Sequence, residues 1–221
     1  DISTRCDGPA LSGTFCFYPQ PTNHIIGGRS SHLPLTNRGE VQAQALGKRL
    51  EREELQFDYI YASDAVRAQH TAQIVCSHLG VTPTSIQTTP SLAEVSQGDW
   101  EGKVRAEIFN DTRSAQIHAD PLHFQAPNGE SQYHARQRMF RWLDNIKAEY
   151  GQQALKVAAF SHGYAIRSLV GHLLEASAMM TRSIITHNTS ITVVRLKEDR
   201  WLIERVNDFS HLDGSSFIDH Y

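Results

Sequence analysis

Cysteine is scarce in this sequence, and the three that occur do not form the pattern of a disulfide framework. Cys6, Cys16 and Cys76 are an odd number in a chain of 221 residues, and no two are spaced as Cys-x-x-Cys. Small secreted domains that depend on disulfides carry denser sets of cysteines, in even numbers. A disulfide-stabilised extracellular protein is therefore not indicated, and a cytoplasmic location in a reducing environment is expected.

Long apolar runs and an excess of one charge are also lacking. No segment approaches the run of about 18 apolar residues that predicts a membrane-spanning helix. The chain has 21 basic and 24 acidic residues, for a net charge of −3, which creates no strong field toward DNA, RNA or an anionic membrane. We expect neither nucleic acid nor a membrane as a partner, so an anion site would have to come from a few placed Arg and His side chains.

The start of the chain lacks both an initiator Met and the apolar stretch of a signal peptide. We interpret this as processing, or as a chain that begins within a longer protein. A length of 221 residues suits one α/β core. We predict a single domain over residues 1–221, with its core at about 14–212 and an insertion over a site at about 103–127.

The apolar periodicity alternates between strand-like and helix-like segments. Asn37 stands three residues before Glu40, the spacing of a capping box, and Ser63 is expected to cap the helix that follows it. We predict strands at 15–18, 57–61, near Ile86, at 156–160, 190–196 and 201–206, and helices from Asn37, from Ser63, at 131–150 and after Gly163. This order predicts an α/β fold of three layers, in which helices cover both faces of a mostly parallel sheet.

Two strand-to-helix junctions carry side chains that suit an anion. Ser63 with Arg67 follows one predicted strand, and Ser161-His162-Gly163 follows another. The carboxyl ends of parallel strands meet at one edge of a sheet, where backbone N–H groups and helix dipoles favour an anion. Taken alone, His162 is equally well a histidine that caps local carbonyls, and Arg67 is more often a solvated helix residue. Together, an imidazole and a guanidinium fork suit a phosphate.

The loop before the predicted insertion offers two carboxylates. Glu94 lies among apolar and aromatic residues, which would raise its pKa toward that of a general acid. By itself it is an ordinary loop glutamate, and Glu101 in the same loop is its rival. The Gly27-Gly28-Arg29 run could surround an anion with backbone N–H groups, although a lone pair of glycines is more often only a turn.

Taken in order, these motifs resemble the histidine phosphatase superfamily, which includes the cofactor-dependent phosphoglycerate mutases. The resemblance covers about residues 15–212. It rests on Gly27-Gly28-Arg29, Pro34-Leu35-Thr36 with Gly39, Ile60-Tyr61-Ala62-Ser63 with Arg67-Ala68 and Thr71-Ala72, the loop 92–102, Ser161-His162-Gly163 and Asn188-Thr189-Ser190-Ile191-Thr192.

The resemblance implies a phosphoglycerate mutase-like fold and hydrolysis of phosphomonoesters through a phosphohistidine. Arg67 and His162 would contact the equatorial phosphoryl oxygens, and Glu94 would protonate the leaving oxygen. Residues 104–125 would form part of a lid that selects the substrate. The partner implied is phosphate or a small phosphorylated metabolite, with no metal and no cofactor. Arg29, Asn23 and His24 are the further candidates for phosphate contacts.

The sequence departs from the family at the nucleophile. The family's Arg-His-Gly follows the first strand, but residues 18–29 read Tyr-Pro-Gln-Pro-Thr-Asn-His-Ile-Ile-Gly-Gly-Arg. Pro19 has no nucleophilic atom and stiffens the loop. The stretch 18–27 is also shorter than in relatives with a similar Gly-Gly-Arg-Ser run, which favours a deletion over a point substitution.

Three interpretations follow from this departure. In the first, the chain is a binding or regulatory protein that keeps a phosphate pocket and has lost turnover. In the second, His24 or, less favoured, His32 enters the pocket as a substitute nucleophile, which requires in-line approach to about 3–3.5 Å. In the third, the chain is a variant of an ordinary phosphatase from which the motif has been lost. Mutase and hydrolase activity are not distinguished by any of these residues.

Overall fold

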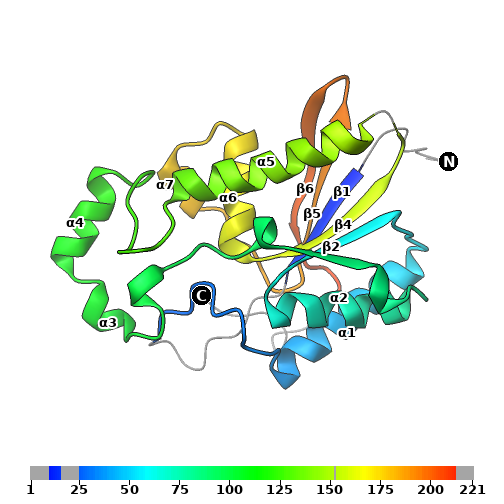
Figure 1. The fold of residues 1–221 in the computed structure, drawn as a ribbon, viewed down its shortest axis with the longest axis horizontal. Coiled ribbons are helices and arrows are strands. Elements are labelled where there is room, and N and C mark those ends of the chain that lie inside the picture. The colour runs from blue at the N-terminus through cyan, green and yellow to red at the C-terminus, as the bar shows by residue number, and fades with distance from the viewer. Residues whose placement is uncertain (1–9, 16–24, 152, 213–221) are drawn as a thin grey trace.

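A six-stranded sheet forms the centre of the molecule in the computed structural model, which describes residues 10–15, 25–151 and 153–212 (Figure 1). The strand order is β3-β2-β4-β1-β5-β6. Strands β3, β2, β4 and β1 are mutually parallel, and β5 and β6 extend the sheet as an antiparallel hairpin. The strands are β1 (Ala10–Phe15), β2 (Tyr59–Ser63), β3 (Ile86–Thr89), β4 (Lys156–Ser161), β5 (Ile191–Lys197) and β6 (Arg200–Asp208).

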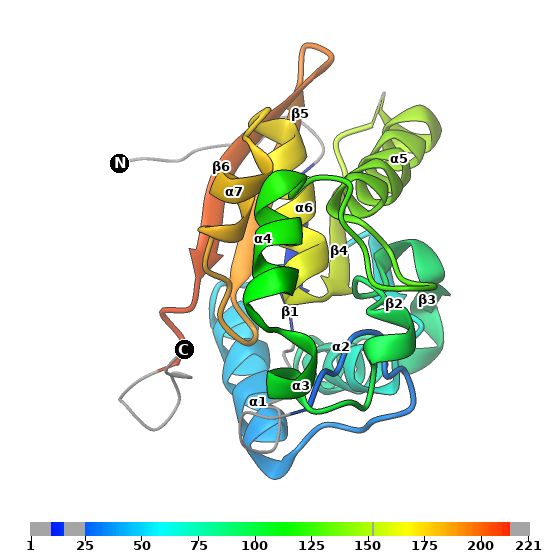
Figure 2. The ribbon, with the colours of Figure 1, turned by 90° about the vertical axis from the view of Figure 1, so that its left-hand side faces the viewer.

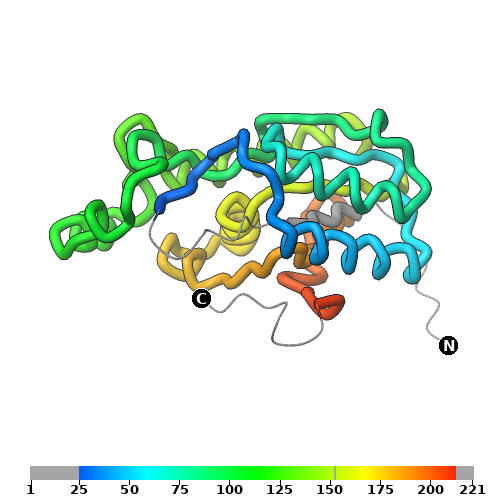
Figure 3. Tube along the Cα trace, turned by 90° about the horizontal axis from the view of Figure 1, so that it is seen from below, coloured from blue at the N-terminus to red at the C-terminus, as the bar shows by residue number. Residues whose placement is uncertain are grey.

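Helices cover both faces of this sheet, which confirms the predicted α/β class (Figures 1 and 3). Helices α1 and α2 lie side by side on one face, and α5 and α6 lie on the other. The helices are α1 (Asn37–Arg52), α2 (Val66–His78), α3 (Arg105–Ile108), α4 (Asp111–Ala119), α5 (Gln132–Tyr150), α6 (Gly163–Leu173) and α7 (Ala178–Arg182). Short 3-10 turns η1 (Pro83–Ser85), η2 (Pro90–Leu92) and η3 (Gly98–Trp100) lie in the connections.

Strand β4 shows why a continuous apolar run belongs at the centre of such a sheet. Val157 and Ala159 pack toward α5 and α6, whereas Ala158 and Phe160 pack toward α1 and α2. Successive side chains of a strand point to opposite faces, so a strand that is covered on both sides needs apolar residues at every position. The prediction of a central parallel strand at 156–160 is confirmed by the pairing of β4 with β1 and β2.

Several predicted boundaries differ from the structure: β2 is Tyr59–Ser63 and not 57–61, and β5 and β6 differ from 190–196 and 201–206 by one or two residues at their ends. The first strand is Ala10–Phe15, not 15–18, and residues 16–18 lie outside the described part of the chain. Thr36, not Asn37, is the N-cap of α1, because its hydroxyl accepts from the Gly39 N–H at 3.1 Å. Ser63 is the last residue of β2, and α2 begins at Val66 after the cap residue Ala65. Pairing of Ser63 with Thr89 keeps it in the sheet, where its backbone conformation is fixed by strand neighbours.

The segment between β3 and α5 contains α3 and α4, which project from one end of the molecule (Figures 1 and 3). Figure 2 views the molecule from this end, with α4 toward the viewer. A small apolar cluster of Ile26, Trp100 and Ala126 anchors the base of this segment. The backbone of Ile25 also pairs with Val104, so the chain before α1 is joined directly to the segment.

Within the described residues, no helix combines the length and apolar character needed to cross a membrane.

A polar cluster joins α1 to the end of β6 and contains a titratable histidine. The Arg49 guanidinium donates to Asp208 and to Glu53, each at 2.7 Å, and to Nδ1 of His211 at 3.4 Å. Nε2 of His211 lies 2.9 Å from the Thr189 hydroxyl. Burial, followed by the positive charge of Arg49, lowers the pKa of His211 to about 4. The folded state therefore favours the neutral imidazole.

This cluster predicts a loss of stability in mild acid. A histidine whose pKa is lower in the folded state contributes its full stability above its unfolded pKa of about 6.5, and the contribution falls as the pH drops toward about 4. Between pH 7 and pH 5 we expect His211 to account for a loss of about 2 kcal/mol. Urea unfolding of the wild type and His211→Gln at both pH values measures it. Equal acid losses in the two proteins would contradict the assignment.

Candidate functional site

His162 and Ser63 meet where β2 and β4 end side by side. His162 is the N-cap residue of α6 and is only 2% exposed. Its Nε2 lies 2.8 Å from the hydroxyl oxygen of Ser63, the last residue of β2. Because β2 and β4 pair in parallel, their carboxyl ends reach the same edge of the sheet. The structure thus brings together the two junctions that were selected from the sequence.

The surroundings of His162 are dry and positively charged. Burial, followed by the charges of Arg67 and Arg138, holds the pKa of His162 well below its ordinary value. The imidazole is therefore neutral at pH 7 in the ligand-free protein. An anionic ligand would offset the two guanidinium charges.

Arg67 lies in the first turn of α2 and is 4% exposed. Its Nη1 atom donates to the carbonyl oxygens of Arg29 and Ser30, at 3.2 and 2.9 Å. In the same region the Val66 N–H donates to the carbonyl of Ser31 at 2.8 Å. The loop that carries Arg29 is therefore bound to the N-terminal end of α2. Arg67 both holds this loop and, in addition to burial, lowers the pKa of His162.

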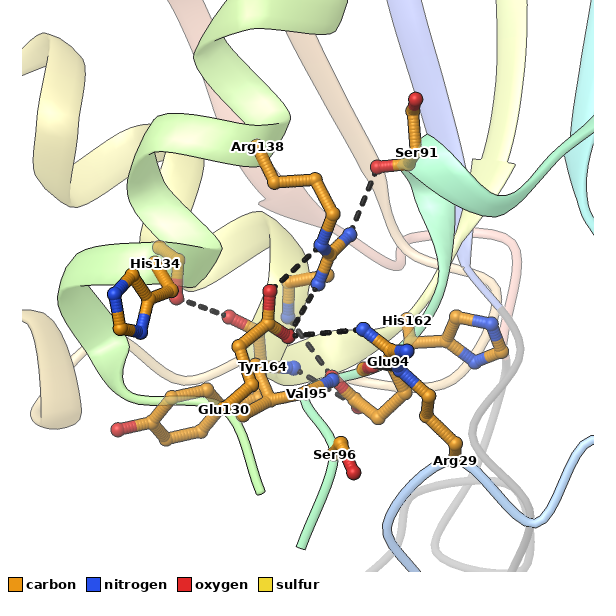
Figure 4. Close-up of polar contacts among 12 residues, drawn as sticks. Arg29, Ser91, Glu94, Val95, Ser96, Glu130, His134, Arg138, His162 and Tyr164 are labelled. Carbon is orange, nitrogen blue, oxygen red and sulfur yellow. Dashed lines mark hydrogen bonds and ion pairs between the residues drawn. The ribbon is translucent and has the colours of Figure 1, made fainter. Parts of the chain in front are cut away.

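Glu94 occupies the N-terminus of α6. Its Oε1 accepts from the N–H groups of Val95 and Ala165, at 2.8 and 3.0 Å, and its Oε2 accepts from Tyr164 at 3.2 Å (Figure 4). The apolar surroundings expected from the loop sequence are not the main contacts of this carboxylate. The N–H groups of Tyr164 and Ala165, expected to receive an anionic ligand, already receive an anion from the protein itself.

Glu101, the rival glutamate, joins two loops. Its Oε1 accepts from the N–H groups of Arg29 and Gln97, both at 2.9 Å. Gly28 has a φ of +53°, which favours glycine, and a Cβ there would displace the Glu101 carboxylate. In the Gly27-Gly28-Arg29 turn, the Arg29 N–H therefore donates to the Glu101 carboxylate of the protein itself. Glu101 has a structural role in this arrangement.

Glu130 and Arg138 complete the polar network, although sequence reasoning did not select them. Arg138 forms two parallel bonds to Glu130, at 2.8 and 2.7 Å, and donates to the Ser91 carbonyl at 2.8 Å. The Arg29 side chain bridges Glu130, at 3.4 Å, and the Glu94 carbonyl, at 3.0 Å (Figure 4). The only signal in the sequence was a Glu immediately before the N-cap Ser131, with an Arg two turns later on the same helix.

The remaining candidates are placed as follows. Asn23 and His24 lie outside the described residues, so their contact with phosphate stays a prediction. His32 is an exposed turn residue. Among residues 10–15, 25–151 and 153–212, no group of three or more His, Cys, Asp or Glu side chains is arranged to hold a metal ion.

Comparison with known sequences identifies relatives of the whole fold. A family model described as the histidine phosphatase superfamily (branch 1) matches residues 20–209. The chain is 32% identical over 201 residues to a protein of Enterobacter sp. (strain 638) named "Probable phosphoglycerate mutase GpmB", with 83% of this chain and 86% of the relative covered. A protein of the same name from Yersinia pestis (strain Pestoides F) is 30% identical over 200 residues, with 83% and 85% covered.

Solved structures show the same architecture. Bacillus stearothermophilus YhfR superposes with a TM-score of 0.79 and 26% identity, covering 93% of this chain and all of that one (100%). A mutant of Entamoeba histolytica phosphoserine phosphatase in complex with phosphoserine gives a TM-score of 0.78 at 21% identity, covering 92% and 99%. The phosphoglycerate mutase-like fold predicted from the sequence is thereby confirmed.

Proposed function

Because this chain belongs to the histidine phosphatase superfamily, we propose that it binds small phosphate monoesters where His162, Arg67 and Glu94 meet, and that it hydrolyses them slowly or not at all. The observation that carries the proposal is the 2.8 Å contact between His162 and Ser63, which joins the two strand ends at a buried edge where Arg67 and Arg138 act on the imidazole. Relatives named as mutases and as phosphatases share this part of the chemistry, the binding of a phosphomonoester.

The roles of the side chains follow from their placement. Arg67 supplies a buried positive charge beside His162, and the imidazole supplies a nitrogen for a phosphoryl oxygen. Glu94 is fixed by three backbone N–H groups and would face the leaving oxygen of the ester. The segment 103–127, with α3 and α4, would cover the bound ester and select its alcohol part.

The weak turnover follows from the sequence of the segment that comes after β1. Phe15, the last residue of β1, pairs with Ser161, one residue before His162, and the family's nucleophile follows its first strand. The sequence supplies no Arg-His-Gly at that place. Without a nucleophile the phosphohistidine cannot form, and the easier two-step route is lost. A cytoplasmic location stays a prediction from cysteine usage.

A binding experiment tests this function. Vanadate or inorganic phosphate should bind the full chain in calorimetry, and incubation with a phosphomonoester should leave no acid-labile phosphohistidine on the protein. Arg67→Ala and His162→Ala should each weaken binding by about 10-fold or more, because each removes a charge-assisted or buried hydrogen bond. His172→Ala and Arg136→Ala are matched controls, since both are partly buried groups whose pKa values are lowered chiefly by burial.

A hydrolysis assay decides between loss of turnover and a substitute nucleophile. The wild-type chain should show no steady-state release of phosphate above that of His24→Ala. Sustained hydrolysis that disappears in His24→Ala would contradict the proposed loss of turnover and identify His24 as the nucleophile. Absence of any vanadate or phosphate binding would contradict the binding function itself.

A further inference from the structure

The hydroxyl of Ser63 has three polar neighbours, and their chemistry determines the direction of each hydrogen bond. The Ala65 N–H donates to the Ser63 oxygen at 3.3 Å, and the hydroxyl donates to the Asp64 carboxylate, also at 3.3 Å. A serine hydroxyl has one hydrogen and two acceptor lone pairs. In the arrangement with the hydrogen on Asp64 and one lone pair on Ala65, the remaining lone pair accepts from Nε2 of His162, 2.8 Å away.

We propose that Ser63 is a positioning residue for His162, which fixes the ring with its hydrogen on Nε2 and reserves Nδ1 for a phosphoryl oxygen. Since Nε2 is bound to Ser63, Nδ1 is the ring nitrogen left for a ligand. In this tautomer Nδ1 carries a lone pair, whereas a phosphate ester dianion offers only acceptors. Binding of the dianion therefore adds one proton from solvent to Nδ1, which takes the ring from neutral to a charge of +1.

The charges around the ring are consistent with the uptake of one proton when the dianion binds. Arg67 on α2 and Arg138 on α5 disfavour the imidazolium in the free protein. On the other side, Asp64 follows β2 and accepts from Ser63, and the Glu94 carboxylate lies at the start of α6. Glu130, before α5, already pairs with Arg138. A bound dianion adds two further negative charges, which favour the imidazolium and allow the ring to gain its proton.

The first step, the assignment of the hydrogen to Nε2, concerns the ligand-free protein. Only the second step, the proton uptake on binding, rests on the proposed phosphate site. Ser161 provides a matched control for Ser63. It is 1% exposed, directly precedes His162, and donates from its hydroxyl to the Leu92 carbonyl at 2.7 Å without contacting the imidazole. Ser63→Ala and Ser161→Ala thus remove equally buried hydroxyls from neighbouring positions.

Long-range ¹H–¹⁵N spectra of the full chain, labelled at histidine, report which ring nitrogen of His162 carries the hydrogen. The free wild type and Ser161→Ala should show one tautomer with the hydrogen on Nε2, and Ser63→Ala should show exchange between the two tautomers. A wild-type ring with its hydrogen on Nδ1 would overturn the proposal. So would a Ser63→Ala protein that keeps the single Nε2–H form.

Calorimetry with methyl phosphate, a monoester whose dianion has no P–OH donor, at pH 7.5 in buffers of different ionisation enthalpy tests the second step. The wild type should take up close to one proton per methyl phosphate, and Ser63→Ala should bind about 10-fold more weakly, as expected when one hydrogen bond that positions a ligand group is lost. Ser161→Ala should stay within about twofold. Methyl phosphate binding without proton uptake would overturn this step. A wild type that binds no methyl phosphate would contradict the proposed function instead, while the tautomer of the free protein would still decide the role of Ser63.

Discussion

Gly98→Ala should destabilise the protein by about 3–4 kcal/mol, whereas Gly80→Ala should cost only about 1–2 kcal/mol. Both glycines have positive φ, +49° and +67°, so each alanine meets the same backbone strain. A Cβ at Gly98 would in addition lie 2.1 Å from the Pro127 carbonyl oxygen and 2.5 Å from the Gly129 nitrogen. At Gly80 there is nothing within 4 Å. Backbone atoms cannot rotate away, so only Gly98→Ala forces two loops apart.

Urea unfolding at pH 7 measures this difference as a shift in the midpoint at an unchanged slope. Gly102→Ala is a second control, with a φ of +80° and nothing within 4 Å. Similar losses at all three positions would show that the contact between the Gly98 loop and residues 127–129 does not constrain the fold. Because Glu94 and Glu130 lie on these two segments, we also expect Gly98→Ala to weaken phosphate binding.

Glu130→Ala should cost about 2–3 kcal/mol of stability, somewhat less than the roughly 3–5 kcal/mol typical of breaking a fully buried ion pair, because this pair is only partly buried. Glu130 and Arg138 are 11% and 18% exposed at their side chains, and the substitution leaves a guanidinium without its two-bond partner. Asp199→Ala removes an ion pair to Lys147 with an N–O distance of 2.6 Å. Since the Asp199 side chain is 84% exposed, that change should cost less than about 1 kcal/mol.

The two variants should be compared by thermal and urea unfolding at low and high salt. The loss from Asp199→Ala should shrink as salt screens the exposed pair, and the loss from Glu130→Ala should persist. Equal and salt-sensitive losses would contradict a structural role for the partly buried pair. Glu130→Gln provides an intermediate case, because it keeps the shape of the side chain and one acceptor oxygen.

The sequence was sufficient to place Arg67 and His162 at one edge of a parallel sheet. That inference needed only the alternation of elements and the rule that carboxyl ends of parallel strands meet, and the contact between Ser63 and His162 agrees with it. The capping role predicted for Ser63 was wrong for a related reason. Local preference favours serine as a helix cap, but pairing of β2 with β3 continues through Ser63 and outweighs that preference.

The distinction between Glu94 and Glu101 could not be made from the sequence. Both lie in one loop, seven residues apart, and both also accept from neighbouring N–H groups of that loop. They differ in their distant partners, which are at the start of α6 for Glu94 and in the Arg29 turn for Glu101. The pair of Glu130 and Arg138 was missed for a similar reason. Glu130 precedes its helix, and contact with Arg138 depends on how the chain turns into α5, which no periodic pattern records.

The carboxylates of Glu94 and Glu101 accept hydrogen bonds from backbone N–H groups that would otherwise face solvent or a ligand. Together with Arg67, which binds the carbonyls of Arg29 and Ser30, they cross-link the walls of the site. These contacts hold the walls together in the ligand-free protein, so under the proposed function little ordering entropy would be lost on binding. If the proposed function holds, changes in one short loop would remove turnover and leave this preformed pocket in place.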